Sequence, residues 1–225
     1  MCSSDLVDII QNCEVTGLDI SNGQITGVQT TRGAIKAKKV GIAVAGHTGH
    51  LATMAGMRLP IESHVLQAMV SEPVKPCLDT VITSGAVHCY ISQSDKGELV
   101  MGGDLDFYNS YAQRGNFPRI EDVVSSVITM FPSFSRLRLM RTWGGVMDMS
   151  MDGSPIISKT PTKGFYINGG WCYGGFKATP GSAWVFAHTI ANDEPHELNG
   201  QYRLERFQQG HMIDEHGAGP TPGAH

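Results

Sequence analysis

The first 60 residues show two hydrophobic patterns. Apolar and polar residues alternate along three short stretches, and a Ser-Asn-Gly turn at 21–23 separates the first two, so a meander of antiparallel strands is predicted. These strands are expected at 15–20, 25–31 and 34–38. Residues 40–46 are apolar throughout, which is typical of a strand covered on both faces. A short helix is expected at 48–54, closed by Gly56.

A different pattern begins after Pro60. Four short apolar stretches separated by turn residues predict an antiparallel sheet, with strands at 65–71, 80–83, 87–92 and 99–102. Apolar residues at helical spacing predict an amphipathic helix over 120–131, ended by Pro132. A further strand is expected at 137–142. The apolar stretch 7–10 also looks like a strand, although no start signal precedes it.

The last part of the chain contains a strand, a glycine-rich loop and a helix. The strand at 165–168 is apolar and leads into the loop at 169–181. The helix is expected over 179–192, with Pro180 in its first turn, where proline is tolerated. Beyond it the chain becomes polar, and residues 217–225, rich in glycine, proline and alanine, are expected to be disordered.

This order of elements predicts a mixed fold of the α+β / α/β class. We divide the chain into four segments, two of which flank an inserted sheet. They are 7–58 (meander, buried strand and short helix), 59–141 (antiparallel sheet plus helix), 142–192 (strands, glycine-rich loop and helix) and 193–225 (tail).

The glycine-rich loop is the strongest candidate for a functional site. It combines five glycines with large aromatic residues and Lys177. Glycine lets backbone N–H groups approach a flat or anionic ligand, and the start of the following helix favours an anion. The loop therefore either grips a cofactor, with Lys177 facing an anion, or forms a tight strand-to-helix crossover with a buried aromatic plug.

Composition narrows the classes of function. The net charge of −4 without a basic block argues against nucleic acid or an anionic membrane as a partner, and no apolar run is long enough to span a bilayer. The five cysteines are widely spaced and form no CxxC motif, so neither a metal site nor a disulfide framework is expected. A reducing, cytoplasmic setting fits this usage.

Several short sequence motifs carry a family resemblance, and they occur in a fixed order. They are Ala-Gly-His at 45–47, Arg-x-Trp-x-Gly at 141–145, Asp-Gly-x-Pro-Ile-Ile at 152–157 and Gly-x-Trp-x-x-Gly-Gly-Phe-Lys at 169–177. Together they resemble the C-terminal half of the D-amino-acid oxidase/glycine oxidase family of FAD-dependent amine oxidoreductases. Within that family the chain is most similar to the beta subunits of heterotetrameric sarcosine oxidases, over residues 7–215.

The resemblance does not include the dinucleotide-binding unit with which members of the family begin. The family begins with a Rossmann βαβ unit whose Gly-x-Gly-x-x-Gly motif holds the FAD pyrophosphate, and that motif is missing from this chain. The expected fold is therefore the C-terminal part of a two-domain oxidase, with FAD-domain segments flanking a substrate domain. Residues 1–6 do not match the family, which favours a truncated or misassembled reading frame.

The resemblance implies roles for ten residues. The catalytic candidates are Lys177, which would reach the substrate carboxylate, Tyr90, over the substrate amine, and His64, on the flavin's substrate side. The cofactor-binding candidates are Gly46, His47, Gly170, Gly174, Gly175, Phe176 and Thr179. Structural alternatives stay open for these groups: an exposed lysine at a helix start, a cross-strand tyrosine, a core histidine and a plain turn.

The implied activity is oxidation of sarcosine (N-methylglycine) to glycine, with hydrogen peroxide and with formaldehyde or methylene-tetrahydrofolate as the one-carbon product. FAD would be bound non-covalently, and FMN would lie at a subunit interface, attached to a histidine absent from this chain. The implied partners are alpha, gamma and delta subunits and, through the complex, tetrahydrofolate. The alternatives are oxidation of dimethylglycine or a D-amino acid, or an inactive fragment.

Overall fold

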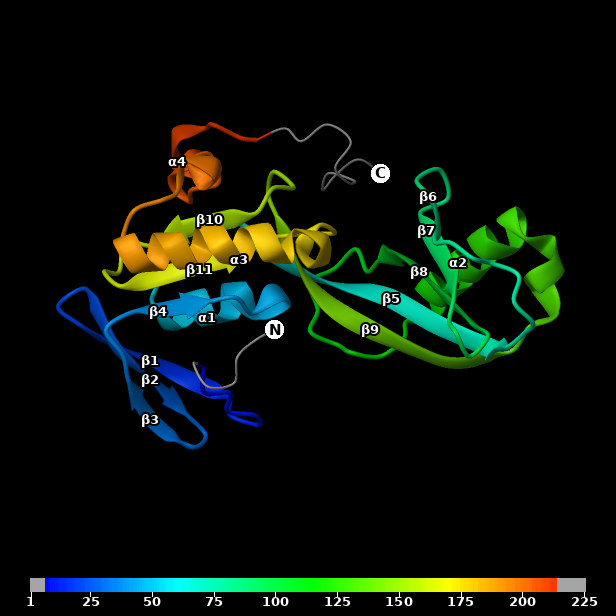
Figure 1. Ribbon diagram of the computed structural model, residues 1–225, viewed down its shortest axis with the longest axis horizontal. Helices are drawn as coiled ribbons and strands as arrows, with labels where there is room; N and C mark the ends of the chain where they lie inside the picture. The colour runs from blue at the N-terminus through cyan, green and yellow to red at the C-terminus, as the bar shows by residue number, and fades with distance from the viewer. Residues whose placement is uncertain (1–6, 214–225) are drawn as a thin grey trace.

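The computed structural model describes residues 7–213, which form two lobes (Figure 1). The first lobe contains the N-terminal strands, the last helices and a small mixed sheet. The second contains a larger sheet covered by one helix. Two long paired strands, β5 (Ile61–Pro73) and β9 (Leu139–Ser150), run from one lobe into the other.

The first lobe begins with the predicted meander. Its strands pair antiparallel in the order β1-β2-β3 and are β1 (Val15–Ser21), β2 (Gln24–Thr30) and β3 (Gly33–Lys36). The following strand β4 (Val40–Ile42) is shorter than expected, because Ala45 has a φ of 47° and begins the 3₁₀ helix η1 (Ala45–His47). Helix α1 (Thr48–Met54) and the left-handed Gly56 (φ 70°) confirm the predicted helix and its end.

Strand β4 belongs to the mixed sheet of order β10-β11-β4. It runs parallel to β11 (Phe165–Gly169), which pairs antiparallel with β10 (Ile156–Lys159). Helix α3 (Gly175–Asn192) covers one face, since a side chain at Gly41 would meet Phe186 and Ile190. The other face buries Ile42 and Ile167 against the meander and α1. The apolar run at 40–46 therefore does mark a strand covered on both sides.

The second lobe is the predicted antiparallel sheet plus helix. The five strands follow the order β6-β7-β8-β5-β9, with β6 (Ile82–Ser84), β7 (Cys89–Gln93) and β8 (Glu98–Leu105). Helix α2 (Phe117–Met130) buries Val123 and Val127 against one face, next to Met69. Pro132 follows the helix and begins the 3₁₀ helix η2 (Pro132–Arg136). The other face of this sheet, which carries His64, Leu66 and Ala68, faces away from α2.

The structure differs from expectation in several places, and β5, β8 and α2 each begin earlier than expected. Strand β9 was expected to end at 142 but continues to Ser150, because β5 offers it a paired edge along its whole length. Helix α3 begins at Gly175 rather than at 179, so Pro180 lies inside the helix and not in its first turn. Residues 7–10 form no strand, and Val7 and Ile9 are exposed. The part of the tail that the structure describes contains η3 (Glu197–Asn199) and α4 (Glu205–Gln209).

Two predictions lie beyond the described residues, namely those for 1–6 and for 217–225. The division of the chain at 58, 141 and 192 stays a prediction. Among the described residues, no helix combines the length and the apolar composition that a bilayer span requires.

Candidate functional site

The glycine-rich loop joins β11 to α3 through a tightly hydrogen-bonded turn. Gly170 and Cys172 both have left-handed φ angles, 73° and 51°, and the N–H of Gly174 donates to the backbone oxygen of Trp171 (2.9 Å). Gly174 is the N-cap of α3, and no described side chain caps this helix. The N–H groups of its first turn therefore remain available to an external acceptor.

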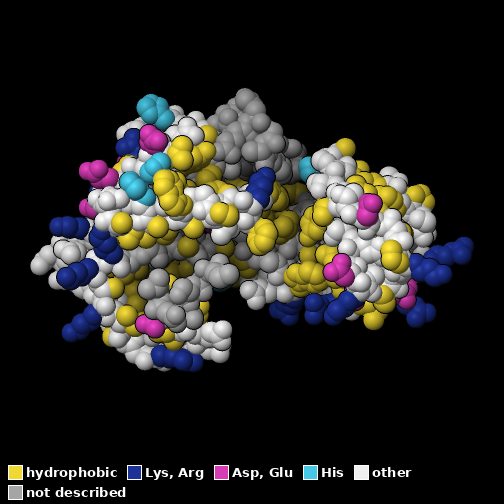
Figure 2. Space-filling view, in the orientation of Figure 1, with side chains coloured by type: hydrophobic (Ala, Val, Ile, Leu, Met, Phe, Trp, Pro, Cys, Tyr) yellow, Lys and Arg dark blue, Asp and Glu magenta, His cyan; other side chains and the backbone are white. Residues whose placement is uncertain are grey.

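A cavity of about 410 Å³ lies against this loop and the first half of α3. Its walls come from the loop, from the turn after β9 and from the segment after α3. They include Trp171, Cys172, Tyr173, Gly174 and Lys177, with Asp152, Pro155, Leu198 and Tyr202 opposite. This volume is within the range of small-molecule sites, and Lys177 brings a positive charge to it. Figure 2 shows hydrophobic side chains gathered where the two lobes meet.

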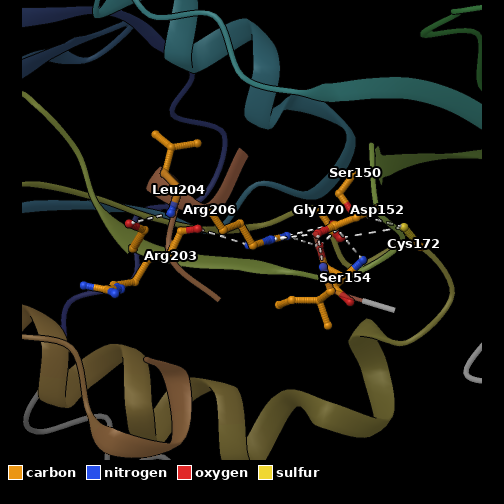
Figure 3. Close-up of polar contacts among 10 residues, drawn as sticks. Ser150, Asp152, Ser154, Gly170, Cys172, Arg203, Leu204 and Arg206 are labelled. Carbon is orange, nitrogen blue, oxygen red and sulfur yellow. Dashed lines mark hydrogen bonds and ion pairs between the residues drawn. The ribbon is translucent and has the colours of Figure 1, made fainter. Parts of the chain in front are cut away.

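A buried ion pair stabilises the side of this cavity that contains Asp152. Arg206 donates from Nε and Nη2 to the two carboxylate oxygens of Asp152, each at 2.8 Å, and also to the backbone oxygen of Ser154 (2.9 Å) (Figure 3). Burial alone would raise the pKa of Asp152, but the hydrogen bonds and charge of Arg206 bring that pKa below its usual value. The pair fixes the turn after β9 to the C-terminal segment.

A second buried carboxylate, Asp148 on β9, contacts the loop directly. Its side chain accepts a hydrogen bond from the N–H of Gly170, and its backbone oxygen accepts one from the N–H of Cys172 (3.0 Å). Burial raises the pKa of Asp148, although the surrounding donors act in the opposite direction. The residue sits where β9, the loop and the start of α1 meet.

Gly46 and His47 lie in η1, at the junction of β5 and β9. The hydroxyl of Ser63 donates to the backbone oxygen of Gly46 (2.6 Å), and a side chain at Gly46 would collide with Val146. The ring of His47 lies 5.2 Å from the ring of Tyr111. Only glycine lets η1 approach β9 this closely.

Tyr90 and His64 share one face of the five-stranded sheet. Tyr90 lies over Gly102, where any Cβ would overlap its ring, and burial raises the pKa of the phenol. Gly102 pairs with Ala68, which lies four residues after His64 on the same strand, so both side chains project from the face opposite α2. Nδ1 of His64 donates to the backbone oxygen of Asp106 (2.8 Å), and Nε2 lies 3.1 Å from Glu62.

The loop reaches this sheet face through Cys172. Its side chain packs with Leu66, Leu105, Met147 and Met149, and burial raises the pKa of its thiol. The structure therefore brings the loop, η1 and the sheet face together around β9.

The other predicted residues take different positions. Gly174 and Lys177 line the cavity, and Gly175 begins α3. The side chain of Phe176 is 97% exposed, so it is not a buried plug. Thr179 lies in the second turn of α3 rather than at its start, where its hydroxyl donates to the backbone oxygen of Gly175 (3.1 Å).

Sequence reasoning missed Asp148. Asp148 lies between two methionines in the sequence, and an acid among apolar residues is a weak signal of a buried carboxylate, which needs donors nearby. Its donors lie 22 residues further along the chain, and their position was not visible from spacing.

The mixed sheet, the long paired strands and the loop at the start of α3 define a member of the FAD-dependent oxidoreductases. The model of the FAD dependent oxidoreductase family matches residues 2–189, and this chain belongs to that family. The fold agrees with L-proline dehydrogenase from P. horikoshii (TM-score 0.81, 25% identity, 89% of this chain and 55% of that one). It also agrees with glycine oxidase from Geobacillus kaustophilus (TM-score 0.76, 18% identity, 86% and 52%).

Sequence relatives are closer than these structures. Sarcosine oxidase subunit beta from Rhizobium meliloti (strain 1021) is 58% identical over 219 residues, which is 97% of this chain and 53% of that protein. The subunit of the same name from Arthrobacter sp is 56% identical over 94% of this chain and 52% of its own length. The predicted family and fold class are confirmed. The chain spans about half the length of these relatives.

Proposed function

We propose that this chain is the flavin-facing and substrate-facing part of an FAD-dependent amine oxidase subunit that acts on sarcosine. The observation that carries the proposal is the identity of 58% over 97% of this chain to a sarcosine oxidase beta subunit. The segments 7–58 and 142–192 would form the flavin side, 59–141 the substrate side and 193–225 the tail.

The loop and η1 fit a flavin ring. The first turn of α3 has N–H groups that no described side chain caps, and Gly174 and Gly175 place no side chain before them. These donors would hold the electron-rich edge of FAD, with Gly170, Phe176 and Thr179 on the same segment and Gly46 and His47 on the β9 side. When bound, FAD supplies the hydride acceptor.

Lys177 would hold the carboxylate of the substrate. Sarcosine is a small zwitterion, and an ammonium at the start of α3 can fix its carboxylate by charge without demanding a particular orientation. The exposed position of Lys177 and the cavity beside it leave room for such an anion. Tyr90 and His64, on the sheet face that Cys172 contacts, would border the amine end.

The reaction would remove a hydride and a proton from the N-methylamine, and water would hydrolyse the resulting imine to glycine and formaldehyde. With tetrahydrofolate present, the one-carbon unit would become methylene-tetrahydrofolate. Oxygen would take the two electrons and two protons to give hydrogen peroxide. The electrons would pass through an FMN held at a subunit interface, in a complex with alpha, gamma and delta subunits.

Two alternatives remain. D-amino acid dehydrogenase from Cereibacter sphaeroides is 26% identical over 86% of this chain, which makes a D-amino acid an alternative substrate, beside dimethylglycine. The second alternative is that the chain alone, which spans about half the length of these relatives, is inactive until a complementing part is present.

The test is amine oxidation by a longer subunit that contains this sequence, assembled with its partner subunits. Sarcosine, dimethylglycine and D-alanine are compared by hydrogen peroxide release and flavin reduction. We expect sarcosine to give the highest kcat/KM. Flavin reduction by D-alanine but not by sarcosine would overturn the proposed substrate. Production of the 225-residue chain alone, expected to be colourless, tests whether it binds FAD without the rest.

A further inference from the structure

We propose that Asp148 is a positioning residue, whose carboxylate holds the backbone of Gly170–Cys172 and thereby sets the start of α3 and the place of Lys177. The effect of Asp148 on catalysis rests on the proposed function. The structural role of Asp148 does not, because its contacts lie within this chain.

The loop forms a backbone nest around this carboxylate. The N–H of Gly170 donates to the carboxylate of Asp148 and that of Cys172 donates to the backbone oxygen of Asp148 (3.0 Å). The N–H of Trp171, between them in the sequence, acts to lower the pKa of the carboxyl group. Left-handed φ angles at Gly170 and Cys172 are typical of nests, which bind anions in other proteins. Here the anion is a side chain of the protein itself.

The same carboxylate is packed against the start of α1. A side chain at Gly169 would lie 2.8 Å from Oγ1 of Thr48 and 3.2 Å from Oδ2 of Asp148, so the hydroxyl and the carboxylate flank this backbone. Thr48 is fully buried and directly follows η1 with Gly46 and His47. Asp148 thus joins β9, the loop and the start of α1, which directly follows η1.

No Lys or Arg among the described residues forms an ion pair with Asp148, which is 3% exposed. Its charge is therefore stabilised by backbone N–H dipoles rather than by a counter-ion. The replacement Asp148→Asn would keep one acceptor oxygen, turn the other into an NH2 donor and remove the charge, without leaving an unpaired cation behind. The hydrogen bonds to the loop would therefore be weakened, and an N–H group that faces the NH2 group would lose its acceptor.

A displacement of the backbone at Gly170–Cys172 would also displace Lys177, because the connection between them is short and hydrogen-bonded. The N–H of Gly174 bonds to Trp171, and the chain is helical from Gly175 onward. The turn at 171–174 and the first residues of α3 are therefore all that lies between the nest and Lys177. Asp148 would therefore affect how well Lys177 binds the substrate carboxylate, and not the chemical step itself.

The first measurement is hydrogen exchange in the assembled longer subunit. In Asp148→Asn, which keeps the size but replaces an acceptor by a donor, peptides covering 170–172 are expected to exchange at least 10-fold faster. Val127→Ala in the α2 core is the matched control for a general loss of stability, and it should leave these amides unchanged. Unchanged protection in Asp148→Asn would overturn the proposal, whatever the activity. If Asp148→Asn does not fold, Asp148→Glu replaces it, because the longer side chain displaces the acceptor from Gly170; unchanged protection of 170–172 would again overturn the proposal.

The second measurement is a double-mutant cycle with Lys177→Met. If Asp148 acts by placing Lys177, Asp148→Asn should weaken binding of acetate, read from the flavin absorbance, by about 10-fold, and should add little in the Lys177→Met background. KM for the amine should rise more than kcat falls. Full additivity would overturn the positioning role. Acetate binding needs no turnover, so a wrong substrate assignment would leave this result intact.

Discussion

Arg206 and Asp152 meet through two parallel hydrogen bonds of 2.8 Å, although 54 residues separate them. Their side chains are 4% and 3% exposed. The carboxylate also accepts hydrogen bonds from the N–H groups of Ser154 and Ile213, so both charges are nearly fully satisfied. The pair fastens the segment after α3 to the turn that lines the cavity, as Figure 3 shows.

Replacement of Arg206 by Met should destabilise the protein strongly. It would leave the Asp152 carboxylate buried without its cation, which typically costs about 3–5 kcal/mol. Thermal or urea unfolding of the longer subunit measures the effect. Asp122→Asn is the matched control, because its ion pair with Arg119 is more exposed and should contribute less than about 1 kcal/mol. Equal losses in the two variants would contradict the assigned role of the buried pair.

The contribution of Asp152 should depend on pH in a defined direction. Its folded pKa is lowered from the ordinary value of 3.8, since the donors and charge of Arg206 outweigh burial. Such a carboxylate contributes stability above its unfolded pKa and loses it as pH falls through the folded pKa. The difference in unfolding free energy between the unmodified protein and Asp152→Asn should therefore be largest near neutral pH and shrink below about pH 4. A difference that grows on acidification would contradict this sign.

Lys177→Met should raise KM for a carboxylated amine by about 10- to 100-fold, the loss expected for a charged hydrogen bond of about 1.5–3 kcal/mol. Steady-state kinetics on the assembled complex measures it. Lys163→Met removes an exposed lysine outside the cavity lining and serves as the control. A similar KM in all three proteins would show that the carboxylate is held elsewhere.

Gly102→Ala should displace Tyr90 from the sheet face. The new Cβ would lie 2.6 Å from Cζ of the ring, which is closer than carbon atoms approach. Overpacking of this kind typically costs about 1–3 kcal/mol. Thermal unfolding reads the cost, and Gly102→Ala combined with Tyr90→Ala should recover part of it. Gly85→Ala, whose new side chain would meet nothing within 4 Å, provides the reference.

Local signals in the sequence predicted most elements of the fold. The helix at 48–54 was predicted with its correct ends because both the apolar spacing and the left-handed Gly56 are local features. Helix α2 was found in the same way, from its spacing and Pro132. These signals need no knowledge of the rest of the chain.

Features that depend on distant partners were not predictable. The last eight residues of β9 are a strand because β5, about 80 residues earlier, pairs with them, while their own sequence contains two adjacent glycines. The start of α3 was placed at Thr179 because Pro180 is usual in a first turn, yet the helix begins at Gly175. The role of Asp148 depends on hydrogen-bond donors that only the folded chain brings close to it.

The paired strands β5 and β9 have a mechanical consequence. They cross from one lobe to the other as a continuous two-stranded ribbon, hydrogen-bonded from Ile61–Ser150 to Ser71–Leu139. A loop between lobes can swing as a hinge, whereas a ribbon must bend or twist and break its ladder to let the lobes part. The described lobes should therefore move as one body.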